Sequence, residues 1–207
     1  MLLDSHDNGS LDAYSRFHDI TLPRIKYTPA YEDTKGFNII ATIPIRVRDM
    51  YLYNGEEKTI PIIYCGNKRG FTHNIRSVVD ERLKPFNPVT ARHASMELYA
   101  ADLKSSKISV ACPGAGPIGS AHNESLAAGA VLFSYESVKK VKILPFGELV
   151  DGENYVSFNL DNLEDKLSWL LANEDEIKRI GENGRTLFNT GYVPRKTAEI
   201  ILKYFND

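Results

Sequence analysis

The chain has 207 residues, of which 43% are hydrophobic and 25% are charged, and this globular composition excludes a disordered or fibrous protein. Its 25 lysines and arginines nearly balance 27 aspartates and glutamates, giving a formal net charge of -2. No polybasic arm is present, so we expect the protein to bind neither nucleic acid nor a membrane surface.

The first 55 residues are irregular. Leu2-Leu3-Asp4 is typical of the end of a short strand that runs into a polar turn. Residues 37–50 are rich in isoleucine, valine and threonine, so we expect an extended segment. Asn54-Gly55 marks a turn. We therefore divide the chain into an N-terminal segment, 1–55, and a domain, 56–207.

From residue 59 onward, short apolar runs alternate with amphipathic segments. The apolar runs predict strands at 60–66, 108–112, 130–135 and 155–158. The amphipathic segments predict helices at 71–84, 91–104, 122–128, 163–172, 174–189 and 194–205. This alternation predicts an α/β fold, namely a Rossmann-like parallel sheet with helices on both faces.

Within these helices the sequence also predicts individual positions. We expect five large apolar residues on helices to face the core, namely Met96, Leu98, Tyr99, Leu103 and Trp169. Ser120 stands where the N-cap of the helix at 122–128 belongs. Gly129 follows that helix in the position where glycine commonly ends one.

The cysteines and the length of the apolar runs indicate the cellular compartment that we expect. Cys65 and Cys112 do not make a disulfide framework, so we expect a reducing, cytoplasmic compartment and buried, inert thiols. No apolar run reaches the roughly 18 residues of a transmembrane helix, and no signal peptide is expected. The five histidines are too scattered to predict a metal site.

Ligands of doubly wound sheets lie beyond the carboxyl ends of the strands, and two segments there stand out. The first begins at Gly66, which permits close backbone approach, and includes Lys68, Arg69 and Arg76, whose charges suit a phosphate. The same residues are also typical of a glycine turn with solvated basic side chains. Their spacing matches neither a Walker A motif nor a dinucleotide fingerprint.

The second segment follows the strand at 108–112. Gly114, Gly116 and Gly119 leave backbone amides uncovered, and a short helix with small residues comes next. Glu124 on that helix has two interpretations. It could stabilise the helix dipole by about 0.3–1 kcal/mol, or it could accept hydrogen bonds from the two hydroxyls of a ribose. Spacing alone does not decide between them.

This second segment carries a resemblance to a known family. The glycine loop and the ESLAAGAV that follows at 124–131 resemble the C-terminal, nucleotide-sugar-binding lobe of GT-B glycosyltransferases, which has a helix written roughly E-A-L-A-x-G. The later GELVDGENYV at 147–156 and EIKRIGENGRT at 176–186 resemble further passages of that lobe. The likeness extends over residues 60–204. It implies a single GT-B lobe, with 1–55 as a remnant of the acceptor lobe.

The resemblance also implies roles for particular residues. Glu124 would bind the ribose hydroxyls, and the amides around Gly114, Gly116 and Ser120 would face the diphosphate and sugar of the donor. Gly66 with Arg69 or Arg76 would neutralise the diphosphate as it leaves. The implied activity is transfer of a sugar from a nucleotide-diphosphate sugar to a glycan or other hydroxyl acceptor. It needs neither metal nor cofactor, in keeping with the lack of an Asp-x-Asp triplet.

The chain departs from the family in two respects. Retaining members often carry an E-x7-E pair, but the residue eight before Glu124 is Gly116. The acceptor lobe usually supplies the catalytic base of inverting members, and here the candidates that precede the sheet are Asp4, His6, Asp7 and His18. The sequence around the first three, DSHDNG, is equally typical of a polar turn.

Other functions therefore remain open. The chain could be a non-catalytic α/β module that binds a nucleotide or a protein, or a different enzyme, such as a phosphosugar epimerase, that uses the same cleft. A partner chain or a second copy could complete the cleft.

Overall fold

A computed structural model describes much of the domain and two short pieces of the N-terminal segment. The described residues are 2–4, 24–26, 47–64, 66, 73–90, 95–113, 118–140 and 148–191. The helix predicted at 194–205 lies outside them, as do residues 37–46 of the extended segment predicted at 37–50. The described end of that segment is not extended throughout, because a 3-10 helix begins at Asp49.

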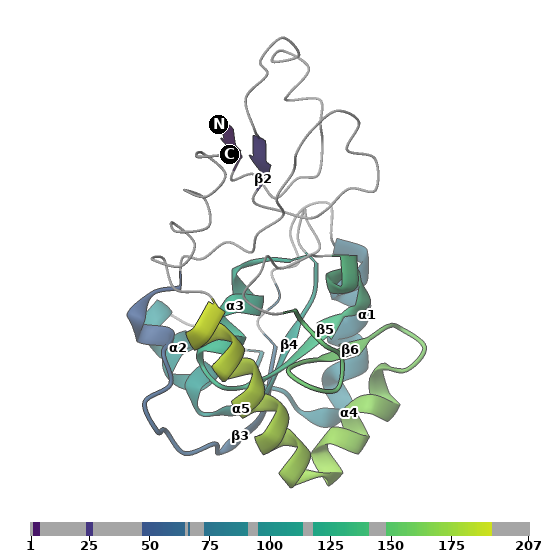
Figure 1. Cartoon of the computed structure of the whole chain (residues 1–207). Helices are drawn as coiled ribbons and strands as arrows, with labels where there is room; N and C mark the ends of the chain where they lie inside the picture. The colour runs from purple at the N-terminus through teal and green to yellow at the C-terminus, as the bar shows by residue number, and fades with distance from the viewer. Residues whose placement is uncertain are drawn as a thin grey trace.

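The described strands form two parallel sheets. In the N-terminal segment, β1 (Leu2–Asp4) pairs with β2 (Arg24–Lys26). The domain contains a four-stranded sheet in the order β3-β4-β5-β6, with every neighbouring pair parallel (Figure 1). Its strands are β3 (Ile60–Ile63), β4 (Ser106–Ala111), β5 (Val131–Tyr135) and β6 (Val156–Phe158). The predicted parallel α/β sheet is confirmed.

Helices alternate with these strands along the chain. The α-helices are α1 (His73–Leu83), α2 (Met96–Lys104), α3 (Ser120–Ala127), α4 (Leu163–Ala172) and α5 (Glu174–Gly191). Three short 3-10 helices accompany them in the described residues: η2 (Asp49–Tyr51), η3 (Lys84–Phe86) and η4 (Glu136–Lys140). No described helix is both long and apolar enough to span a bilayer.

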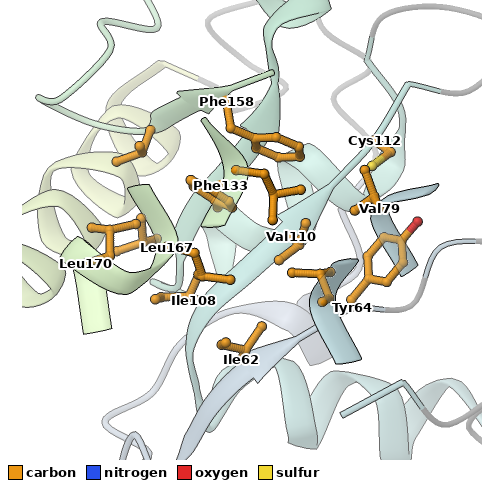
Figure 2. Close-up of a cluster of buried hydrophobic side chains, with 14 of the residues drawn as sticks. Ile62, Tyr64, Val79, Ile108, Val110, Cys112, Phe133, Phe158, Leu167 and Leu170 are labelled. Atoms are coloured by element: carbon orange, nitrogen blue, oxygen red, sulfur yellow. The ribbon is translucent and has the colours of Figure 1, made fainter. Parts of the chain in front are cut away.

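Side chains of the four-stranded sheet point to two hydrophobic clusters, one on each face of the sheet. On β5, Val131 and Phe133 enter one cluster and Leu132 enters the other, because successive side chains of a strand point to opposite faces. The first cluster, drawn in Figure 2, is covered by α1, α4 and the start of α5. The second is covered by α2, α3 and the end of α5. The sheet is therefore buried on both faces.

For two helices, α2 and α4, some of the residues predicted to face the core are exposed. Trp169 is 50% exposed, because Leu163, Leu167 and Leu170 already form the buried face of α4. Met96 and Leu98 are 46% and 55% exposed, whereas the inward position predicted for Leu103 is confirmed and Ala100 is buried beside it. Apolar residues outside the helical stripe thus remain at the surface.

Residues just before position 55 pack against the domain. Tyr51, on η2, is only 4% exposed and belongs to the cluster under α2 and α3. Two residues later, the backbone amide of Tyr53 donates a hydrogen bond to Ala127 O at 3.1 Å. These contacts bring the η2 segment beside α3.

Helix α5 crosses close to its neighbours at two glycines. A Cβ on Gly184 would lie 2.7 Å from Asn154 O and 3.0 Å from Leu126 Cδ2, and a Cβ on Gly181 would lie 2.9 Å from Gly129 O. Carbon and oxygen atoms do not approach this closely without a shift of the backbone. The two glycines therefore allow α5 to lie against the segments that lead into β5 and β6.

We expect Gly184→Ala to destabilise the domain by about 1–2 kcal/mol. Alanine usually stabilises a helix by about 0.5–1 kcal/mol relative to glycine, but here the overpacking outweighs that gain. Urea unfolding measures the difference, with Thr186→Ala, at an exposed position of the same helix, as the control. Equal stability of Gly184→Ala and the wild type would contradict the packing argument.

Candidate functional site

A hollow of about 270 Å³ lies at the carboxyl edge of the sheet. Tyr64 and Gly66 follow β3, Cys112 follows β4, and residues 119–122 begin α3. Arg76 on α1 and Tyr99 on α2 complete the wall. This is the edge at which doubly wound sheets bind their ligands.

The structure brings several of the predicted site residues together. Gly66, Arg76 and Ser120 line the hollow, and Glu124 lies one turn along α3 from Ser120. Glu124 does not line the hollow itself. It is hydrogen-bonded to Tyr99, which does. The remaining predicted residues, Arg69, Gly114, Gly116, His6 and Asp7, lie outside the described residues.

The Glu124 carboxylate is half-buried rather than directed into bulk water. Burial raises its pKa above the ordinary value, while a hydrogen bond from Tyr99 and the charge of Arg48 work in the opposite direction. Helix α3 begins at Ser120, two residues earlier than predicted, so Glu124 lies in the second turn rather than the first. Because the helix dipole acts mainly within the first turn, it does not account for this carboxylate.

Two tyrosines hold the Glu124 carboxylate in place. Tyr99 donates to it, and the Tyr99 ring packs edge-on against the ring of Tyr51, with the centroids 5.8 Å apart. Tyr51 is buried, and both burial and the nearby Glu124 raise its pKa, so its hydroxyl stays protonated. Sequence reasoning missed Tyr99 and Tyr51, because they come from α2 and η2, far from the glycine loop.

We expect Tyr99→Phe to raise the pKa of Glu124 further. The phenylalanine cannot donate the hydrogen bond that favours the ionised carboxylate, whereas burial remains. A carbon-13 NMR titration of the carboxyl carbon measures this shift. As a control, Tyr135→Phe changes a tyrosine on β5 and should leave the titration unchanged; an unchanged titration in Tyr99→Phe would contradict the assignment.

Gly66 lies directly against the ring of Tyr64. A Cβ at this position would be 2.5 Å from Tyr64 Cζ and 2.8 Å from Cε2, so no side chain fits while that ring stays in place. The Tyr64 hydroxyl donates to Arg76 O at 3.1 Å and thereby joins the end of β3 to α1. The bare backbone of Gly66 thus forms part of the wall, as glycine at a close approach requires.

Arg76 brings positive charge to the hollow. Its Nε donates to Pro113 O at 2.9 Å, which fixes the guanidinium beside the loop after β4. Cys112 lies next to it, at the end of the cluster drawn in Figure 2. Burial raises the pKa of the Cys112 thiol to about 12, and Arg76 offsets this only in part. The predicted burial of the Cys112 thiol is confirmed, and Cys65 lies outside the described residues.

His122 is a second residue of the hollow that sequence reasoning did not assign. It is 1% exposed, and its Nδ1 accepts a hydrogen bond from the Gly119 amide at 3.1 Å. Its Nε2 lies 3.1 Å from Ser134 Oγ, and since Nδ1 accepts, Nε2 carries the proton. Burial lowers the pKa of His122 to about 4, so the ring is neutral.

His122 also explains why the predicted N-cap was wrong. Gly119 is the N-cap of α3 and has extended backbone angles, while Ser120 is the first helical residue and is exposed. The His122 ring reaches back to the Gly119 amide in the manner of the N3 residue of a capping box. The signal in the sequence for this N-cap was a histidine three residues after a glycine.

Metal ligands do not gather in the described part of the chain. In the ranges that the structure describes, no three histidine, cysteine, aspartate or glutamate side chains are arranged to hold a metal ion.

Comparison with known proteins finds likeness in structure. No family model matches the sequence, and no curated protein matches it. The structure of TarM superposes with a TM-score of 0.59 at 14% identity, covering 89% of this chain and 43% of that one. TarM is a protein of S. aureus. This chain therefore spans less than half the length of TarM.

Two further structures are similar. HepE from Anabaena, solved with UDP, has a TM-score of 0.59 at 9% identity and covers 84% of this chain and 58% of that one. The C-terminal domain of a group 1 family glycosyl transferase, LpcC from Francisella tularensis, has a TM-score of 0.50 at 13% identity. It covers 70% of this chain and 97% of that domain. The chain thus shares the fold of one Rossmann-like lobe of the GT-B glycosyltransferases.

Proposed function

We propose that the domain binds a nucleotide-diphosphate sugar and that the protein transfers the sugar to a hydroxyl acceptor. The observation that carries this proposal is the half-buried Glu124 beside a hollow at the carboxyl edge of a GT-B sheet. Two proteins with similar structures were solved with UDP: HepE, and TarM, whose complex also contains fondaparinux and α-GlcNAc-glycerol. The acceptor that we propose is accordingly a glycan or a related hydroxyl compound.

In this proposal the donor is held at two places. The ribose hydroxyls donate to the Glu124 carboxylate; burial raises its pKa, and the hydrogen bond from Tyr99 and the charge of Arg48 favour its ionised form. The diphosphate faces Arg76 and the amides at the start of α3, where the helix dipole favours negative charge. The amides of Gly114 and Gly116 and the side chain of Arg69 would add further contacts.

Transfer proceeds by displacement at the anomeric carbon. The acceptor oxygen forms the new bond while the bond to the diphosphate oxygen breaks, and its electron pair leaves with the diphosphate. Arg76 and the α3 amides stabilise that charge, which makes catalysis by a metal ion unnecessary in this proposal. The acceptor proton goes to a general base, for which His6 and Asp7 remain the candidates. Activity that persists in EDTA is the expected result.

Calorimetric titration with UDP and with GDP tests donor binding. We expect one of the two to bind, and Arg76→Gln to weaken that binding at least about tenfold, as loss of a charged contact to phosphate does. Lys84→Gln is the matched control, because Lys84 is exposed on η3 and pairs with Glu81. Failure of both nucleotides to bind the wild type would overturn the proposal.

The alternative is a binding module without transferase activity, and one observation favours it. The chain covers only 43% of the length of TarM, so other parts of a transferase, in this protein or in a partner chain, would have to supply the acceptor side. Hydrolysis of a UDP- or GDP-sugar, or transfer to an added acceptor, separates the two functions. Nucleotide binding without any turnover, alone or with a partner, would support the module.

A further inference from the structure

A second hollow, of about 260 Å³, lies at the opposite edge of the sheet, where the strands begin. Lys58 comes two residues before β3, Lys107 is the second residue of β4, and Gly129 comes two residues before β5. Helix α5 closes the hollow with Arg185 among other residues. The proposed transferase makes no use of this edge.

Two cations converge on one aromatic ring in this hollow. Lys58 Nζ lies 4.7 Å and Arg185 Cζ 5.2 Å from the centroid of the Tyr53 ring. Lys58 also donates to Ala128 O at 2.7 Å, at the end of α3. That bond caps the helix and uses one of the three ammonium protons.

Lys58 and Arg185 carry more N–H donors than the described residues around them accept. Arg185 has five N–H donors, and within the part of the chain that the structure describes it forms neither an ion pair nor a hydrogen bond. The Tyr53 ring attracts both cations, but it accepts no strong hydrogen bond from either. The hollow therefore offers several N–H groups from two like charges that repel each other.

In the described part of the chain, no ion pair joins an acid of the hollow to Lys58 or Arg185. Glu174 pairs with Lys107 at 2.8 Å, Asp175 and Glu182 are exposed, and Lys178 adds a further cation to the lining. Burial lowers the pKa of Lys58 to about 8; Glu56 raises it in part, and Arg185 lowers it. Glu56 itself pairs with Lys104. An anion between Lys58 and Arg185 would relieve the repulsion and keep Lys58 charged.

We propose that this hollow binds the phosphate group of a small molecule between the Lys58 ammonium and the Arg185 guanidinium. The guanidinium fork matches phosphate oxygens in a bidentate manner, and the ammonium supplies a second point charge. A phosphate monoester carries about -1.5 to -2 charges near pH 7, which matches the two cations, whereas a monocarboxylate would neutralise only one. The volume leaves room for a small organic group beside the phosphate.

Calorimetric titration with inorganic phosphate at pH 7 and constant ionic strength tests this inference. We expect saturable binding that Arg185→Gln and Lys58→Met each weaken at least about tenfold, since each removes one charged contact. Lys84→Gln, which removes an equal charge at a position that does not line the hollow, should bind as the wild type does. Thermal unfolding of each variant checks that it is folded, and Arg185→Lys gives a milder change that keeps the charge.

Two further titrations distinguish this hollow from the one at the carboxyl edge and from general attraction of anions. Saturation with UDP should leave phosphate binding unchanged, and acetate should bind more weakly than phosphate. Competition between UDP and phosphate, or loss of phosphate binding in Arg76→Gln but not in Arg185→Gln, would place the phosphate at the carboxyl edge and overturn the inference. Absence of binding to the wild type, or equal weakening by Lys84→Gln, would overturn it as well. None of these results depends on transferase activity.

Discussion

Replacing Glu124 by alanine should weaken binding of the preferred nucleoside diphosphate by about 100-fold. A carboxylate that accepts hydrogen bonds from two ribose hydroxyls makes charge-assisted bonds, each stabilising by about 1.5–3 kcal/mol. Glu124 suits that role because Tyr99 and Arg48 favour its ionised form, while burial, which raises its pKa, excludes part of the water that would compete. Calorimetry with the wild type and Glu124→Ala measures the loss directly.

A nucleotide that lacks both ribose hydroxyls makes this prediction sharper. For the wild type, the 2′,3′-dideoxy nucleotide should bind about as weakly as the full nucleotide binds to Glu124→Ala. In the variant, removal of the hydroxyls should cost almost nothing further, since their partner is already absent. Glu97→Ala, at an exposed position of α2, removes the same charge nearby and should have little effect on nucleotide binding. If the loss of binding free energy from Glu124→Ala and the loss from removing the ribose hydroxyls added up independently, Glu124 would be excluded as the ribose ligand.

The order and type of the elements could be predicted from the sequence, because this sheet is buried on both faces. Apolar runs such as 108–112 then stand out against amphipathic helices, and glycine or proline separates them. Helix ends were less predictable. Helix α3 starts at Ser120 because the His122 side chain caps it, and this contact depends on rotamers that periodicity does not report.

The site was only partly predictable for a similar reason. Gly66, Arg76 and Ser120 could be placed at one edge because the carboxyl ends of parallel strands meet there. Tyr99 contacts Glu124 only after α2 packs beside α3, and no local pattern predicts that contact. The hollow around Lys58 and Arg185 was not predicted either, since it joins residues more than 120 positions apart, from the start of β3 to the middle of α5.

His122 should make the folded state sensitive to acid. Its pKa is about 4 in the folded chain, against an ordinary value of 6.5, because the buried ring would have to be protonated without water. Above pH 6.5 the ring is neutral in both states, and its contribution to stability is complete. As the pH falls toward 4, the unfolded chain takes up a proton that the folded chain does not. About 3 kcal/mol of stability should be lost over this window.

His122→Gln should remove this acid sensitivity, because glutamine does not titrate. At pH 7.5 the variant should be less stable than the wild type by about 1–2 kcal/mol, because the imidazole joins the Gly119 amide to Ser134 Oγ, whereas glutamine keeps an acceptor for the amide but loses the contact to Ser134. This difference in stability between the wild type and the variant should vanish or change sign near pH 4.5. Glu56 and Glu124, whose pKa values are lowered and raised, remain in both proteins and cancel from the difference. Ser134→Ala removes the Nε2 partner but keeps the imidazole, so urea unfolding should show its acid sensitivity intact. A constant gap between His122→Gln and the wild type at both pH values would show that His122 is protonated as readily in the folded chain as in the unfolded one.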